Sequence, residues 1–241
     1  MSSENTKNRK IIIGLGSGRS GTASLAFFLD SQSDSYVVHE SSFGLPGLFK
    51  YTVGNYLPWE TNERAFNNWY NKLQSYSRSH QYYGDVCSSL IQYVPQILAL
   101  NPDVVFVCLK RDKKKVVNSF KKITFGVNHW KKTTLNKYFD YWYDMYPKYL
   151  DDSKDDAVSK YWDQYYSLAE SYQSSYVNFR IFSIEDLNSE SGRDAILEHI
   201  GIPSHKRIIT GAFHINKSIP VLLAILIRLV SFPRNVIRRF S

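Results

Sequence analysis

Short apolar runs alternate along the chain with amphipathic stretches of helical spacing. The runs are rich in β-branched and aromatic residues and end at polar or turn residues, so they predict buried strands at 11–13, 35–38, 81–85, 104–109 and 177–183. Between them, apolar residues three and four positions apart predict helices at 22–29, 61–73, 90–100, 116–120 and 194–200. Strands that alternate with helices in this way predict an α/β fold, in which helices cover both faces of a parallel sheet.

The composition is that of a folded protein in a reducing compartment. Hydrophobic residues make up 43% of the 241 residues, which is enough for a core. The two cysteines, Cys87 and Cys108, lie inside predicted structural segments and form no metal or redox motif. Residues Met1 to Lys10 are polar and do not resemble a signal peptide, so we expect a cytoplasmic protein.

The most informative stretch joins the first predicted strand to the first predicted helix. Its sequence is Gly14-Leu15-Gly16-Ser17-Gly18-Arg19-Ser20-Gly21-Thr22. Glycines let the backbone approach an anion closely, and the N–H groups of such a turn and of the following helix N-terminus point toward it. Arg19 adds a fixed positive charge with a planar set of donors. The loop therefore predicts a site for a phosphorylated ligand.

Two general kinds of nucleotide site compete as interpretations of this loop. A Walker-type triphosphate site needs a lysine where this chain has Thr22, so that interpretation is weak. A dinucleotide-binding turn fits locally, because Gly16, Gly18 and Gly21 satisfy G-x-G-x-x-G. Glu40 also ends the next strand at about the spacing of a ribose-binding acid. An NAD(P)-dependent oxidoreductase is thus the leading alternative function.

A second basic segment follows the predicted strand at 104–109. Arg111 lies just past the carboxyl end of that strand, where ligands of open α/β sheets bind. Ser119 comes about two helical turns later, so both side chains reach one phosphate if the helix lies across it. An ordinary charged helix start is the plain alternative. Beside the glycine loop, however, this pair favours a second, separate phosphate, which a dinucleotide site leaves unexplained.

Together these motifs resemble those of the sulfotransferase family. Gly18-Arg19-Ser20-Gly21-Thr22 is similar to the family's 5′-phosphosulfate loop, and Arg111 with Ser119 matches its 3′-phosphate motif in spacing. Further similar motifs follow in the family's order, at Gly84-Asp85-Val86-Cys87-Ser88, Phe182-Ser183-Ile184-Glu185-Asp186-Leu187 and His199-Ile200-Gly201-Ile202-Pro203. The resemblance implies a P-loop-type central parallel sheet with helices on both faces.

The resemblance covers most of the chain, with two departures. It spans Ile11 to about Lys217. Lys113 stands where the family has proline, which is a helix-starting aid and not a ligand. Ala23 replaces a second hydroxyl of the phosphate cradle, and Ser24 follows it directly.

The resemblance also implies a reaction and the residues that bind its donor. The donor is 3′-phosphoadenosine 5′-phosphosulfate, and its sulfuryl group moves to an acceptor hydroxyl or amine, with carbohydrates and lipids among the candidate acceptors. This chemistry requires no metal, and we expect none. The residues expected to bind the donor are Gly18, Arg19, Ser20, Gly21, Thr22, Ala23, Ser24, Arg111 and Ser119.

Catalysis needs a base for the acceptor's proton and positive charge for the leaving phosphate. Arg19 is expected to supply that charge. Glu40 is the preferred base and His39 the second, and only one of the two is expected to face the site because side chains alternate along a strand. Asp85 is a third candidate, which could bind substrate or orient Arg19 through an ion pair. His214 lies where the family's late loop closes over the nucleotide.

The last part of the chain has a different composition. We predict a sulfotransferase-like domain over 1–217 and an apolar, basic tail over 218–241. The run 221–232 is apolar apart from Arg228, but it is shorter than the ~20 residues that span a bilayer. The net charge is +8, and basic residues without any acid gather in the tail, which fits an anionic membrane surface as well as a helix docked on the core.

The charge distribution also bears on partners. An excess of positive charge that is concentrated at one end of the chain does not favour nucleic acid as a partner. We expect the nucleotide donor and the acceptor as partners, and a peripheral position on the cytoplasmic face of a membrane if the tail binds lipid. A nucleotide-binding, membrane-associated protein without catalysis remains the alternative that is not an enzyme.

Overall fold

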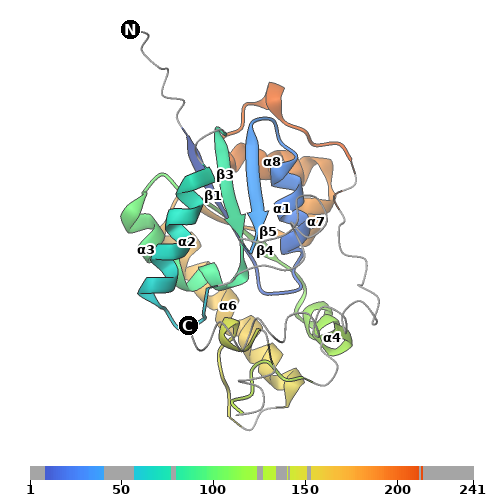
Figure 1. Cartoon of the computed structure of the whole chain (residues 1–241). Coiled ribbons are helices and arrows are strands. Elements are labelled where there is room, and N and C mark those ends of the chain that lie inside the picture. Colours follow the sequence, from blue (N-terminus) through green and yellow to red (C-terminus); the bar gives the residue numbers. More distant parts are fainter. Residues whose placement is uncertain are drawn as a thin grey trace.

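The computed structural model describes residues 9–40, 57–76, 80–123, 127–133, 140, 142–150, 153–211 and 213. Within these residues a five-stranded sheet forms the centre, and every strand pair in it is parallel (Figure 1). The strand order is β2-β3-β1-β4-β5. The strands are β1 (Lys10–Leu15), β2 (Ser35–His39), β3 (Tyr82–Val86), β4 (Val105–Lys110) and β5 (Phe179–Ser183). The predicted α/β class is confirmed.

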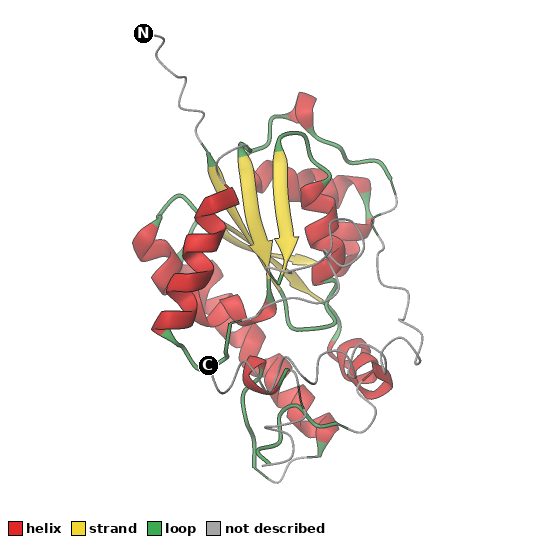
Figure 2. Cartoon of the chain, viewed as in Figure 1, coloured by secondary structure: helices red, strands yellow, loops and turns green. Residues whose placement is uncertain are grey.

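Helices cover both faces of this sheet (Figure 2). One face carries α1 (Thr22–Asp30), α7 (Ile184–Asn188) and α8 (Glu190–Ile200). The other carries α2 (Glu63–Tyr76), the 3₁₀ segment η1 (Ser88–Tyr93), α3 (Val94–Leu100) and α6 (Lys154–Ser175), with α4 (Lys113–Ile123) against α6. Two short 3₁₀ turns, η2 (Tyr143–Met145) and η3 (Ser204–Lys206), complete the described helical segments.

The apolar strands form two cores because neighbouring side chains point to opposite faces. In β1, Ile11 and Ile13 pack beneath α2 and α6, while Ile12 packs beneath α1 and α8. All three are buried. A strand covered on both faces needs apolar residues at every position, which explains the uninterrupted isoleucine run.

All the strands point the same way, so their carboxyl ends meet at one edge of the sheet. β1 ends there in the glycine loop, β2 in His39 and Glu40, and β4 in Lys110 and Arg111. In an open α/β sheet this edge is where ligands bind. The fold therefore gathers residues that are far apart in sequence at one place.

Several element boundaries differ from the sequence prediction by a few residues, and two of the differences have a clear local cause. The helix predicted at 90–100 is split into η1 and α3, because Pro95 stands at the start of α3 and lacks the N–H that a continuous helix would use. The strand predicted at 177–183 begins only at Phe179. Val177 is 99% exposed, and the turn after α6 is closed by a hydrogen bond from Phe179 N to Tyr176 O (3.1 Å).

The predictions for His214 and for the tail 218–241 lie outside the described residues. Among the helices that the structure describes, none combines the length and the apolar character needed to cross a bilayer.

Candidate functional site

The glycine loop leads from β1 into a helix that has no side-chain cap. Gly21 precedes α1 with φ 102°, a conformation that favours glycine, and no side chain caps the helix there. An added Cβ at Gly21 would also meet Ile184 Cδ1 at 2.5 Å. Amide groups at the start of an uncapped helix are left to bind water or a ligand. The buried Ser20 Oγ has no hydrogen-bond partner either among the described residues.

Arg19 connects this loop to the second basic segment. Its Nε donates a hydrogen bond to Ser119 Oγ on α4 (3.1 Å), and its backbone carbonyl accepts one from Arg111 Nη1 (2.9 Å). Burial lowers the pKa of Arg19, an effect that Tyr146 opposes and Arg111 reinforces. Arginine keeps its charge even so. The structure thus brings together three residues that the sequence placed in two separate phosphate motifs.

His39 and Glu40, at the end of β2, have different surroundings. His39 Nε2 lies 3.1 Å from Thr22 Oγ1 in the first turn of α1, and its buried Nδ1 has no partner within the described part of the chain. Burial, and to a smaller extent the charge of Arg19, lowers the pKa of His39 to about 4. His39 is therefore neutral at physiological pH.

The pKa of Glu40 is shifted in the opposite direction. It follows the strand with φ 53°, and its N–H donates to Val86 O (3.0 Å). Burial first, and then the negative charge of Asp85, raises the pKa of Glu40 to about 8. A carboxyl group with such a pKa is suited to accept and release a proton near neutral pH.

Asp85 is completely buried on β3, below the end of the sheet. Its Oδ2 accepts a hydrogen bond from Trp69 Nε1 on α2 (2.8 Å). A buried carboxylate is expensive unless it is bonded, and the indole N–H supplies one bond. The negative charge of Asp85 also contributes to the raised pKa of Glu40.

Three tyrosines of the site were not singled out from the sequence. Tyr146 is buried, and its hydroxyl oxygen lies so close to Gly18 that an added Cβ there would be 2.7 Å from it. Tyr165 and Tyr166 on α6 bind the backbone of the glycine loop. The chain holds 18 tyrosines, most of them at helical spacing typical of core residues, so the pattern gives no signal for these three.

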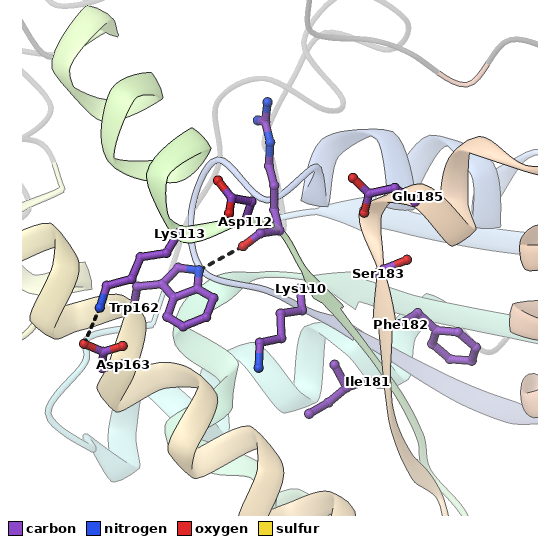
Figure 3. A pocket seen from close by; sticks show the side chains of 10 residues that line it. Lys110, Asp112, Lys113, Trp162, Asp163, Ile181, Phe182, Ser183 and Glu185 are labelled. Atoms are coloured by element: carbon purple, nitrogen blue, oxygen red, sulfur yellow. Dashed lines mark hydrogen bonds and ion pairs between the residues drawn. The ribbon is translucent and has the colours of Figure 1, made fainter.

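An open pocket of about 670 Å³ lies beside Arg111, at the ends of β4 and β5. Figure 3 shows Trp162 and Lys113 on one side and Phe182 and Ser183 on the other. Trp162 Nε1 donates to the carbonyl of Arg111 (3.0 Å), which fixes the backbone between β4 and α4. Partly exposed ion pairs border the pocket, Lys113 with Asp163 (2.6 Å) among them. Such pairs contribute little stability individually.

Comparison with known proteins assigns the chain to a family. The model of the sulfotransferase family matches residues 11–167, a stretch that contains the glycine loop, Arg111 and Ser119. The chain belongs to the sulfotransferase family. The predicted family is therefore confirmed. No curated protein matches this sulfotransferase.

The solved structures that are similar to this sulfotransferase include another sulfotransferase and a kinase. A sulfotransferase from Alicyclobacillus acidocaldarius has 14% sequence identity and a TM-score of 0.48, over 95% of this chain and 94% of that chain. The shikimate kinase from Bacteroides thetaiotaomicron has 14% identity and a TM-score of 0.41, over 80% of this chain and 99% of that chain. Family membership makes the protein a transferase of sulfuryl groups.

Proposed function

We propose that this sulfotransferase takes its sulfuryl group from 3′-phosphoadenosine 5′-phosphosulfate and passes it to an acceptor hydroxyl or amine. The observation that carries the proposal is the meeting of Arg19, Ser119 and Arg111 through two hydrogen bonds. A donor with two separate phosphates accounts for both segments. The glycine loop would hold the 5′-phosphosulfate, and Arg111 with Ser119 would hold the 3′-phosphate.

The strand order disfavours the alternative of a dinucleotide site. In the dinucleotide-binding fold the second strand lies beside the first, so the acid at its end reaches the ribose. Here β3 lies between β1 and β2, which separates Glu40 from the glycine loop by one strand. Glu40 therefore does not occupy the position of a ribose-binding acid.

The residues present fit an anionic donor. The uncapped start of α1 and the unpartnered Ser20 Oγ offer donors at the glycine loop. Thr22 and Ala23 are buried in the first turn of α1, and Ser24 is partly buried beside them. Ser20 N–H is used within the loop, where it donates to Ser17 O (3.1 Å), so the amides of Gly21 and Thr22 are better placed to bind the phosphosulfate.

Glu40 is the proposed general base. As the acceptor oxygen or nitrogen bonds to sulfur, the bond from sulfur to the 5′-phosphate oxygen breaks and the acceptor's proton passes to the Glu40 carboxylate. Arg19 and the loop amides stabilise the negative charge that develops on the leaving phosphate. His39 has a different proposed part, because its Nε2 contacts Thr22 and so holds the first turn of α1.

Thermal stabilisation by nucleotides tests the proposed donor class. Adenosine 3′,5′-bisphosphate should raise the melting temperature more than NAD, NADP or ATP does, because only it carries the required pair of phosphates. Stabilisation by a dinucleotide alone would contradict the proposal. A screen of sugars, phenols, lipids and simple alcohols with the sulfuryl donor then identifies the acceptor.

Replacement of Glu40 by glutamine separates an enzyme from a nucleotide-binding scaffold. The Glu40→Gln variant should bind adenosine 3′,5′-bisphosphate like the unchanged protein and lose sulfuryl transfer by roughly a hundredfold or more, since a general base contributes 10²–10⁴-fold. If Glu40→Gln transfers at the normal rate, Glu40 is not the base.

For the tail 218–241 we propose a membrane-surface helix at the cytoplasmic face. The support is its apolar run flanked by arginines, a pattern typical of helices on anionic lipid. The test is flotation with anionic liposomes before and after deletion of 218–241. Loss of flotation supports the proposal, and equal flotation of both proteins contradicts it.

A further inference from the structure

Helix α6 passes the carboxyl ends of the strands (Figure 1). Two adjacent tyrosines of this helix bind the glycine loop. Tyr165 Oη accepts a hydrogen bond from Gly16 N (2.8 Å). Tyr166 Oη accepts one from Ser17 N (3.3 Å) and lies 3.2 Å from Ser17 Oγ. Both tyrosines are fully buried, so these bonds form away from competing water.

Each phenol also donates its own proton to a second element. Tyr165 Oη donates to Ser88 O at the start of η1 (3.1 Å), and Tyr166 Oη donates to Leu109 O in β4 (2.7 Å). One hydroxyl thus links the loop to the segment after β3, and the other links it to the strand that leads to Arg111. The two tyrosines fix the loop relative to both of its neighbours.

We propose that Tyr165 and Tyr166 are positioning residues for the donor's 5′-phosphosulfate. By binding the amides of Gly16 and Ser17, they fix the first half of the loop. The following amides, up to the start of α1, are then directed at the anion without any cost of ordering at the moment of binding. This inference rests on the proposed donor, because it assigns the loop to the 5′ side.

The same helix offers a matched control. Tyr172 lies two turns after Tyr165 on α6, and its ring packs against Tyr176 and against Phe179 at the start of β5. The glycine loop lies at the opposite, carboxyl end of the strands. The Tyr172→Phe variant therefore loses the same atom from the same helix without releasing a loop amide.

The experiment compares ligands that carry a phosphate at only one position. Affinities of adenosine 5′-monophosphate, adenosine 3′-monophosphate and adenosine 3′,5′-bisphosphate are measured by calorimetry or competition for the unchanged protein and for Tyr165→Phe, Tyr166→Phe and Tyr172→Phe. The tyrosine-to-phenylalanine change keeps the packed ring, and either loop variant suffices if the other fails to fold. Thermal unfolding establishes that each variant is folded.

We expect Tyr165→Phe and Tyr166→Phe to weaken the 5′-monophosphate and the bisphosphate by the same factor, roughly tenfold for one lost hydrogen bond with an amide left unpaired. Binding of the 3′-monophosphate should not change, and Tyr172→Phe should bind all three ligands normally. Unchanged affinities in both loop variants would overturn the inference. Equal losses for the 3′ and 5′ monophosphates would overturn it too, because they indicate general loosening. Failure of the unchanged protein to bind the bisphosphate would instead refute the proposed donor.

Discussion

His39 and Glu40 are adjacent in sequence, but their surroundings at the end of β2 shift their pKa values in opposite directions. Burial is the main cause of both pKa shifts, because it disfavours the charged form of each side chain. It lowers the pKa of His39 to about 4 and raises that of Glu40 to about 8. Near neutral pH the histidine no longer titrates, and the glutamate is the group that changes charge.

The rate of sulfuryl transfer should therefore rise with pH. As the proposed base, Glu40 must be ionised to accept the acceptor's proton, so kcat should increase between about pH 6 and 9 with an apparent pKa near 8. The measurement is a pH–rate profile of the unchanged protein and of Glu40→Gln. The residual rate of Glu40→Gln should not show this rise with pH. If the rate of Glu40→Gln still rises over the same pH range, another group is the base.

The raised pKa of Glu40 also predicts how stability depends on pH. The folded state holds a proton on Glu40 up to about pH 8, whereas the unfolded chain releases it near pH 4.5. Between these values the folded state binds more protons, so this residue makes the free energy of unfolding fall as pH rises, by at most about 1.4 kcal/mol per pH unit.

Urea unfolding of the unchanged protein and of Glu40→Gln at pH 5.5 and pH 9 measures this contribution, because all other groups cancel in the comparison. Glu40→Gln should gain stability relative to the unchanged protein at the higher pH. An equal difference at both pH values would show that the Glu40 pKa is not raised.

The sequence could predict the polar and charged candidates for phosphate binding but not the phenols beside them. Arg19, Arg111 and Ser119 stand in short motifs that resemble those of the sulfotransferase family. Tyr165 and Tyr166 are the partners of backbone amides, and a backbone amide carries no sequence signal. Their helical spacing is also that of the many tyrosines that simply fill the core.

At the scale of elements, β3 depends on close contact with β1. An added Cβ at Gly84 would overlap the carbonyl oxygen of Ile12 on β1. The strands cannot separate without breaking the ladder, so the clash cannot be relieved by a rotamer change.

We expect Gly84→Ala to destabilise the protein by about 2 kcal/mol or more, the upper range for overpacked sites. Chemical denaturation measures the change in the free energy of unfolding. A variant with the stability of the unchanged protein would mean that β1 and β3 are not paired in this register.

Element types were more predictable than their boundaries. The uninterrupted apolar run of β4 and the apolar stripes of the helices predict these elements, because burial acts along the whole length of each element. Boundaries depend on single contacts. Val177 belongs to an apolar run but lies in the turn after α6, where Asn178 Nδ2 bonds Pro102 O (3.1 Å) across the chain.

At the scale of the whole molecule, strand order gives the motifs their meaning. The glycine loop alone fits a dinucleotide as well as a phosphosulfate, and local sequence does not reveal which strands are neighbours. With β1 between β3 and β4, the loop lies next to the segment that begins at Arg111. Long-range pairing of this kind arises from packing of the complete chain, so the sequence motifs indicated it only through their resemblance to a family.

The most direct test of the two-phosphate site is a calorimetric comparison of adenosine 3′,5′-bisphosphate with adenosine 5′-monophosphate, in the unchanged protein and in Arg111→Ala. The unchanged protein should bind the bisphosphate roughly tenfold to a hundredfold more tightly, the range for a lost charge-assisted hydrogen bond, and Arg111→Ala should lose that preference for the bisphosphate over the monophosphate. Equal affinity of the unchanged protein for both ligands, or tight binding of NADP in place of the bisphosphate, would contradict the account.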